Sequence, residues 1–330
     1  MKKIGLGFKV TGAQGGGVLK GRRTDMVLLL VAAVWGSSYL AAKTATSVLP
    51  VLVVLVARYA ISAVACLGIV GKRRFTRDEV RAGGLLGVTQ AAVLTLETYG
   101  VAYTSAANAG LIISLTIVLT PLLDGAAGTR RLPLSFFAAT GVCLSAVTLL
   151  MAGTGFQRPR GGDLLILAAA VVRAGHVVLV GRLTRGRAVR PLQVTAVQMV
   201  VGAALLVGPA AGSLPMLTQV GASVWAQLVY LALFCSVFAF LAQTWAVQQT
   251  SASRASLLLG TEPVWAFVIG IGLGGERVTV LAGIGSALMV AGTYWGQSID
   301  RAHRARSAGR AGADDAEGLL QRRLPGQHVA

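Results

Sequence analysis

Charged residues are scarce in this sequence. Only 13% of its 330 residues are Asp, Glu, Lys or Arg, and 55% are hydrophobic. Soluble domains carry about 25% charged residues, so the composition excludes an ordinary soluble fold. Apolar runs of about 20 residues recur through most of the chain, as membrane spans require. We therefore predict an all-α membrane protein whose main partner is the lipid bilayer.

Acidic residues are especially few. The 12 Asp and Glu stand against 30 Lys and Arg, which gives a net charge of +18. In a soluble chain this excess would indicate nucleic-acid binding. Here the basic residues lie mostly in the terminal segments and in short connections between apolar runs, where they orient membrane proteins. No basic stripe alternates with stacking aromatic residues, so we expect no nucleic-acid partner.

Cysteine and histidine are also rare, with three of each. Cys66, Cys143 and Cys235 lie singly within apolar runs, which excludes a disulfide framework and a C-x-x-C metal site. We expect all three to be buried small hydrophobes. The sequence also lacks the spacing of a hydrolase triad or a pair of catalytic carboxylates. It therefore predicts no enzyme, no cofactor and no metal.

Glycine clusters are present but do not form a phosphate-binding loop. They are Gly83, Gly84 and Gly87, and later Gly270, Gly272, Gly274 and Gly275. No strand precedes either cluster, and no Gly-Lys-Ser follows. We expect these glycines to allow close helix packing in the membrane.

Ten apolar stretches are each long enough to cross a bilayer. They are predicted at residues 26–46, 50–70, 82–102, 105–125, 133–152, 163–182, 191–211, 223–246, 254–273 and 278–297. Pro50, Pro133 and Pro191 suit the first turns of helices. Residues 1–24 and 298–330 lack apolar periodicity and are predicted to be disordered tails.

The charges of the connections predict the orientation. With the N-terminus in the cytoplasm, the internal connections hold Lys72, Arg73, Arg74, Arg77, Arg81, Arg130, Arg131, Arg182, Arg185, Arg187, Arg190 and Arg254, and the external ones hold Lys43, Arg158, Arg160 and Arg277. Lys and Arg concentrate in cytoplasmic loops. We therefore expect both termini on the cytoplasmic side of the inner (plasma) membrane.

An internal repeat divides the chain. A shift of 146 residues aligns Thr104–Arg131 with Thr250–Arg277 without a gap, and Thr-Ser-Ala opens both segments. This predicts two five-helix repeats, at 25–153 and 154–297. Because five is odd, the second repeat should enter the membrane inverted relative to the first. Inverted repeats are typical of secondary transporters, whose solute site lies near the midplane between the halves.

Several short motifs reinforce this interpretation. They are Trp35-Gly36-Ser37-Ser38-Tyr39 with Lys43, Arg58, Thr104-Ser105-Ala106-Ala107-Asn108-Ala109, Glu262-Pro263 and Gly275-Glu276-Arg277. Together they resemble the EamA family of the drug/metabolite transporter superfamily, over about residues 26–297. The resemblance implies a ten-helix exporter of amino acids, other small metabolites or drugs, driven by protons or by the solute's own gradient. Arg130 departs from the glutamate that often stands at this position of the first repeat, and Arg173 with His176 is unusual.

Ionised side chains within the spans are the main candidates for function, because each is costly in lipid and needs a partner or water. If Arg58 and Glu97 pack together, they form an ion pair, either a structural lock or a gate that breaks during transport. Glu262 precedes Pro263, which disturbs the helix and frees backbone carbonyls. Glu262 therefore either binds a cationic group or a proton, or serves helix packing.

Arg173 and His176 share one face of a predicted helix, because they lie three residues apart. Together they offer a site for a carboxylate or phosphate of the solute. Alternatively, Arg173 pairs with Glu97, Glu262 or backbone carbonyls, and His176 is a hydrogen-bonded core residue.

Further polar and aromatic residues are candidates for the cavity wall. They are Trp35, Ser38, Tyr39, Asn108, Gln198, Trp245, Thr261 and Trp265. Taken singly, such residues are more often interfacial anchors or interhelical hydrogen bonds, but together they indicate a polar seam.

Two other functions stay open at this point. One is a membrane-embedded enzyme that acts on lipid, with Glu97, Glu262 or His176 as acid or base. The other is a lipid scramblase or structural subunit, which a lipid-exposed polar groove would favour.

Overall fold

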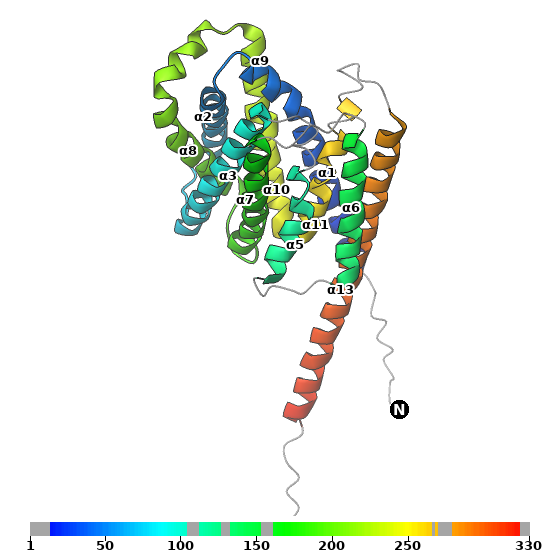
Figure 1. The fold of residues 1–330 in the computed structure, drawn as a ribbon. Helices are drawn as coiled ribbons and strands as arrows, with labels where there is room; N and C mark the ends of the chain where they lie inside the picture. The colour runs from blue at the N-terminus through cyan, green and yellow to red at the C-terminus, as the bar shows by residue number, and fades with distance from the viewer. Residues whose placement is uncertain are drawn as a thin grey trace, which may run out of the picture.

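The computed structural model describes residues 14–103, 112–126, 133–152, 161–265, 268–269 and 279–323. Within these ranges the regular structure is helical and contains no strand (Figure 1). The first half consists of α1 (Gln14–Thr46), α2 (Val51–Val70), α3 (Arg77–Tyr103), α5 (Thr116–Ala126) and α6 (Leu134–Ala152). The second half consists of α7 (Gly161–Thr184), α8 (Pro191–Ala210), η1 (Ala211–Gln219), α9 (Ala222–Ala232), η2 (Leu233–Phe238), α10 (Ala239–Gln249), α11 (Ala252–Leu259) and α13 (Val280–Arg323). The all-α prediction is confirmed.

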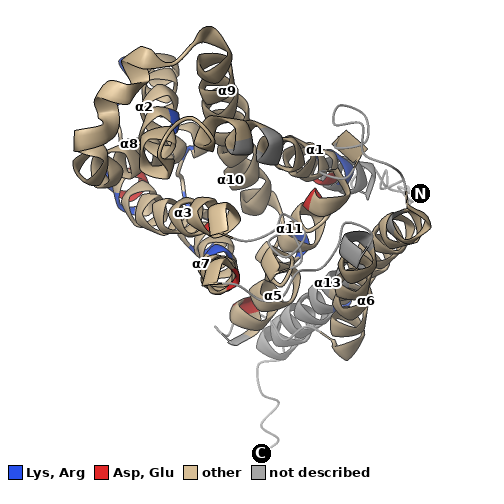
Figure 2. Cartoon of the chain, turned by 45° about the horizontal axis from the view of Figure 1, so that its top comes forward, with Lys and Arg blue, Asp and Glu red and all other residues tan. Residues whose placement is uncertain are grey.

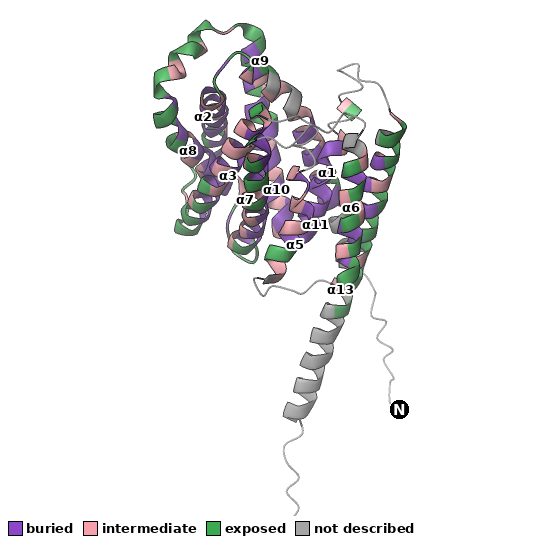
Figure 3. Ribbon diagram, in the orientation of Figure 1, coloured by how far each residue is buried: buried purple, intermediate pink, exposed green. Residues whose placement is uncertain are grey.

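Five helical segments among the described residues are long and apolar enough to cross a membrane. They are Val51–Val70, Arg77–Tyr103, Gly161–Thr184, Pro191–Gln219 and Ala222–Gln249. Charged residues are sparse along the helices (Figure 2). Apolar side chains such as Val64 and Ile69 on α2 and Val290 on α13 are exposed, whereas the faces between helices are buried (Figure 3). A chain with this surface is a multi-pass membrane protein.

The helix pairing follows a twofold pattern. α2 packs against α8 and α6 against α13, so these helices meet their counterparts in the other half (Figure 1). α5 packs against α11, which belongs to the corresponding span of the other repeat. α1 packs against α9 and α10, and α3 packs against α7. Two repeats related by an axis between them require such packing of each repeat's helices against helices of the other. The pattern agrees with the two predicted repeats.

Both terminal helices are longer than expected. α1 begins at Gln14 within the segment predicted to be disordered up to residue 24. α13 runs on to Arg323 through the predicted tail that starts at 298, and it extends beyond the bundle (Figure 1). Ala, Arg and Glu are good helix formers, and lengthening an existing helix needs no new nucleus. The lack of apolar periodicity therefore did not exclude a helix.

Glycine permits the close approach of α3 and α8. A Cβ on Gly83 would lie 2.5 Å from Cβ of Val197 and 2.9 Å from the carbonyl oxygen of Val194. A Cβ on Gly87 would lie 2.8 Å from Cβ of Val201. Both contacts are too short to form, so these two glycines have the packing role predicted for them. The neighbouring Gly84 has open space around it.

This difference predicts opposite effects of one substitution at adjacent positions. Gly83→Ala should destabilise the protein by about 1–3 kcal/mol, because the methyl group overlaps backbone and a branched side chain on α8. Gly84→Ala should be neutral or stabilising by up to about 1 kcal/mol, because alanine favours helix. Thermal unfolding of both variants in detergent micelles tests this. Equal midpoints would show that α3 and α8 are not held this closely.

The start of α3, ahead of the apolar span predicted at 82–102, is tied to the start of α8 by Glu79. The N–H of Glu79 donates to Oγ1 of Thr76 at 3.2 Å, and the N–H of Thr76 donates to Oε2 of Glu79 at 2.9 Å, a capping box. Oε1 of Glu79 accepts from Nε of Arg190 at 2.7 Å, and Oε2 accepts from Nη2 at 2.9 Å. The side-chain hydrogen bonds to Arg190 have the largest effect, and together with the bond from Thr76 they lower the pKa of Glu79 from its ordinary 4.5 to about 2.

The lowered pKa predicts an acid-sensitive contribution to stability. A depressed carboxyl pKa stabilises the folded state above the ordinary value, and this is lost as the pH falls from about 4.5 towards 2. Glu79→Gln should therefore cost about 1–3 kcal/mol near neutral pH and much less at pH 3. Unfolding midpoints at both pH values test this, with the exposed neighbour variant Asp78→Asn as control. The prediction would be contradicted if the difference in unfolding midpoint between the wild type and Glu79→Gln were the same at both pH values.

Candidate functional site

A cavity of about 90 Å³ lies between the two repeats. α1, α2 and α3 line it from the first repeat, and α7, α10 and the segment after α11 line it from the second. Its wall consists of Trp35, Ser38, Ala42, Thr46, Arg58, Gln90, Val93, Leu94, Glu97, Thr98, Val101, Arg173, His176, Phe240, Gln243 and Glu262. A cavity of this size holds several water molecules or part of a small solute.

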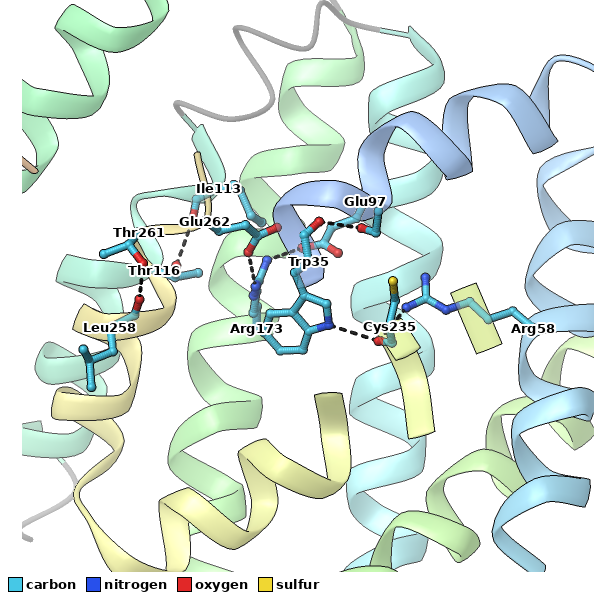
Figure 4. A network of polar contacts seen from close by, with 11 residues as sticks. Trp35, Arg58, Glu97, Ile113, Thr116, Arg173, Cys235, Leu258, Thr261 and Glu262 are labelled. Carbon is cyan, nitrogen blue, oxygen red and sulfur yellow. Dashed lines mark hydrogen bonds and ion pairs between the residues drawn. The ribbon is translucent and has the colours of Figure 1, made fainter. Parts of the chain in front are cut away.

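A charged triad occupies the cavity wall. Nη1 of Arg173 donates to Oε1 of Glu97 at 2.9 Å, and Nη2 donates to Oε2 of Glu262 at 2.7 Å (Figure 4). The Arg173 side chain is 13% exposed, that of Glu97 21% and that of Glu262 8%. The guanidinium also lies 4.8 Å from the centre of the Trp35 ring. One cation on α7 thus connects carboxylates from both repeats.

Of the two interpretations of Arg173, the structure therefore supports the pairing with Glu97 and Glu262. The guanidinium is already engaged by two carboxylates. It does not form an open anion site with His176.

Arg58 has different partners from those predicted. Its Nε donates to Oγ of Ser236 at 2.6 Å, and its Nη2 donates to the carbonyl oxygen of Cys235 at 3.0 Å. Nε1 of Trp35 donates to the same carbonyl at 3.0 Å (Figure 4). The predicted Arg58–Glu97 ion pair is wrong, because the charge of Arg58 is met by this carbonyl and hydroxyl, and Glu97 is bound by Arg173.

The carbonyl is available because the backbone is irregular there. Cys235 and Ser236 lie in η2, a π-helical segment at Leu233–Phe238 that interrupts the predicted span 223–246. π-helical turns alter the i→i−4 hydrogen-bond pattern and occur often at functional sites. Here the turn holds two side chains of the first repeat.

His176, Gln90 and Gln243 also line the cavity. Nδ1 of His176 lies 2.8 Å from Oγ1 of Thr89, and Gln90 and Gln243 are almost fully buried. The sequence prediction included His176 but missed Gln90 and Gln243. Neutral polar residues inside apolar spans were the signal that could have found them.

The other predicted wall residues are distributed more widely. Ser38 lines the cavity, and its hydroxyl donates to the carbonyl of Trp35 at 2.7 Å. Gln198 is buried on α8, and the guanidinium carbon of Arg23 lies 5.7 Å from the centre of the Trp245 ring. Neither Gln198 nor Trp245 lines the central cavity. Thr261 and Trp265 line a separate, mostly apolar cavity of about 300 Å³ together with Asp25. Asn108 and the Tyr39 side chain lie outside the described residues, as do Arg130 and Glu276.

An ion pair joins the two repeats at the other end of their interface. Nη2 of Arg254, on α11, donates to Oδ2 of Asp25, on α1, at 2.5 Å, and both side chains are nearly buried. Oγ of Ser253 donates to Oδ2 of Asp124, on α5, at 3.2 Å. The central cavity instead extends towards Thr46, the last residue of α1, and Val101, near the end of α3. One end of the interface is therefore joined by a nearly buried ion pair, whereas the central cavity extends towards the other end.

Cys66, Cys143 and Cys235 are buried free thiols, as predicted. Among the described residues no group of three or more His, Cys, Asp or Glu side chains is arranged to hold a metal ion.

Comparison with known proteins gives consistent results. The sequence profile of the EamA-like transporter family matches residues 22–152 and 160–295. The chain is 30% identical over 210 residues to the "Uncharacterized transporter YyaM" of Bacillus subtilis, covering 61% of this chain and 68% of that protein. It is 25% identical over 290 residues to the "Probable terminal-alkyne amino-acid exporter" of Streptantibioticus cattleyicolor, covering 86% of this chain and 97% of that protein.

A solved structure, described only as "Crystal structure of protein", shares the fold. It superposes with a TM-score of 0.71 over 85% of this chain and 98% of that chain, at 19% identity. The two matched family segments coincide with the two halves that pack as counterparts.

Proposed function

The chain belongs to the EamA-like transporter family, and on this premise we propose that it is a secondary-active exporter of small zwitterionic metabolites such as amino acids. The observation that carries the proposal is the charged triad in a cavity between the repeats. Solute sites of repeat-built transporters lie at such an interface. The family membership itself makes the chain a membrane transporter of small solutes.

The triad fits a solute that carries both charges. Glu97 and Glu262 offer carboxylates to an ammonium group, and Arg173 and Arg58 offer guanidinium groups to a carboxylate. A zwitterion can replace the Arg173–Glu97 pair charge for charge, with its ammonium on Glu97 and its carboxylate on Arg173, so that Glu262 alone loses its cation. The relative named "Probable terminal-alkyne amino-acid exporter" supports this solute class.

The two ends of the interface fit alternating access. We place both termini in the cytoplasm of a cell with an inner (plasma) membrane, following the excess of Lys and Arg in the connections on that side. The cavity then extends towards the outside, along Thr46 and Val101, and the Asp25–Arg254 pair lies on the cytoplasmic side. Rocking of the repeats about the triad would exchange the two arrangements.

Protons are the candidate coupling ion. Glu262 would bind one when Arg173 turns to the solute, because a lone buried carboxylate is costly when ionised. The proton gradient would then be coupled to solute export.

The two rival functions receive less support from the geometry. A lipid-modifying enzyme needs an acid and a base free to act at one membrane face, whereas Glu97 and Glu262 both bond to Arg173 inside the cavity. A scramblase needs a polar groove that faces lipid, whereas these polar residues lie between the repeats.

Flux in proteoliposomes tests the proposal. Purified protein is reconstituted, and the movement of labelled amino acids, nucleosides and cationic drugs is followed with and without a pH gradient. We expect zwitterionic amino acids to move faster than in protein-free vesicles, and the pH gradient to accelerate them. Movement of nucleosides or cationic drugs alone would overturn the zwitterion proposal, and movement of none of the solutes would overturn the exporter proposal.

A further inference from the structure

Gln90 and His176 line the central cavity, and each has buried polar side-chain atoms without a protein partner among the described residues. Gln90 is 1% exposed and His176 is 4% exposed. Among the described residues, neither amide atom of Gln90 has a hydrogen-bond partner, nor has Nε2 of His176. Each such buried atom costs about 1–3 kcal/mol. Buried polar atoms are almost always satisfied, so a partner from outside the protein is indicated.

The hydrogen bond to Thr89 determines what His176 offers. The Thr89 hydroxyl lies 3.1 Å from the carbonyl oxygen of Leu86 and 3.3 Å from that of Leu85, and it donates its proton to the backbone. With that proton on the backbone, we assign the Nδ1–H of His176 as the donor to the Thr89 oxygen, at 2.8 Å. In a neutral imidazole the other nitrogen then carries a lone pair and no proton. Nε2 of His176 is thus an acceptor.

The Gln90 amide adds both donors and an acceptor, and Gln243 lines the same cavity from α10. The matching solute group must donate to His176 and must both donate to and accept from Gln90. A carboxamide does this, because its NH₂ group supplies two donors and its carbonyl oxygen one acceptor, whereas a hydroxyl has a single proton and cannot donate to both residues.

From these contacts we propose that Gln90 and His176 form a second subsite, which binds a neutral carboxamide on the side chain of the solute. The inference rests on the proposed function and names the solute more narrowly. Glu97 lies seven residues after Gln90 on α3, about 10 Å along the helix. One amino acid can therefore place its charged end at the triad and its polar side chain at the subsite.

The test compares solutes of similar size with and without a carboxamide. Fluxes of glutamine and methionine, and of asparagine and leucine, are measured in proteoliposomes. The wild type should favour the amide of each pair at least about tenfold, because a site built for hydrogen bonds rejects an analogue that leaves its polar atoms unpaired. Gln90→Leu should remove this preference by slowing the amides while methionine and leucine still move.

Gln198→Leu is the matched control. Gln198 is also 1% exposed, and both of its amide atoms are without a partner among the described residues, but it does not line the cavity. Its substitution should leave the preference unchanged. Thermal unfolding gives a second readout: glutamine should raise the midpoint of the wild type and of Gln198→Leu, but not that of Gln90→Leu.

The outcomes separate the two proposals. Suppose that methionine and leucine move in the wild type, but that the ratio of amide flux to analogue flux in Gln90→Leu stays within twofold of the wild-type ratio. The subsite proposal is then wrong, whereas the exporter proposal is unaffected. A lower midpoint of Gln90→Leu without solute, with the ratio unchanged, makes Gln90 a structural residue. If no amino acid moves or raises the midpoint, the proposed function fails and the subsite fails with it.

Discussion

Arg173→Gln is expected to lower solute flux in proteoliposomes at least about 100-fold. Arg173 is bonded to Glu97 and Glu262 at once, so its removal leaves two neighbouring buried carboxylates without their cation. Removing one partner of a buried ion pair costs about 3–5 kcal/mol. Each 1.4 kcal/mol corresponds to a factor of ten, so the arrangement that binds solute should be depleted at least 100-fold. Initial rates at saturating solute measure the loss.

Two further variants show whether the position or only the charge matters. Arg182→Gln removes an exposed guanidinium from the same helix and should leave flux near the wild-type rate. Arg173→Lys keeps the charge but loses the planar fork that reaches both carboxylates, so flux should be intermediate. A folded Arg173→Gln protein with flux within threefold of the wild type would show that the triad is a structural lock and not part of the solute site.

The sequence predicts the helices and the repeats well, because both follow from local composition and periodicity. Apolar length gives the spans, and the 146-residue repeat gives the two halves. The charged triad can also be predicted in part, because a buried ion needs a partner and few acidic residues lie within the spans. Pairing of Arg173 with Glu97 or Glu262 was one of two open interpretations, and the structure has both pairs.

The partners of Arg58 could not be predicted in this way. They depend on the π-helical turn at Leu233–Phe238, whose carbonyl binds Trp35 and Arg58 from another repeat. Such a turn is stabilised by tertiary contacts and has no clear pattern of its own in the sequence. The rotation of each helix is likewise undetermined by composition. This is why Gln198 and Trp245 were expected in the cavity, whereas Gln90 and Gln243 line it.

Asp25→Asn is expected to open the repeat interface at the end opposite the cavity mouth. The Asp25–Arg254 pair joins α1 to α11 across the two repeats and is nearly buried. The sequence repeat aligns Arg254 with Asn108, so the equivalent position of the first repeat carries an amide instead of a cation. The end of the interface at Asp25 and Arg254 is therefore held by an ion pair, and the first repeat does not carry the same cation for the other end. Loss of the pair should shift the population towards the oppositely open state at least about tenfold, for a difference of about 1.4 kcal/mol or more.

Labelling of an introduced cysteine measures this shift. Ser256 is buried and lines a small cavity with Glu262 and Arg173, about half a turn along α11 from Arg254. With Cys66, Cys143 and Cys235 replaced by alanine, Ser256→Cys should react with a membrane-impermeant maleimide from the Arg254 side. The rate should rise at least about tenfold in Asp25→Asn, and in Arg254→Gln as well.

Charge reversal separates a gate from general loosening of the fold. The double variant Asp25→Arg with Arg254→Asp restores an ion pair at the same place and should return labelling towards the starting rate. Asp78→Asn removes an exposed carboxylate elsewhere in the chain and should not change it. If the double variant labels as fast as Asp25→Asn while its unfolding midpoint is restored, the pair stabilises the fold but does not hold this end closed. The asymmetry between the two ends would then need a different cause, with the packing of α1 against α11 as the next element to test.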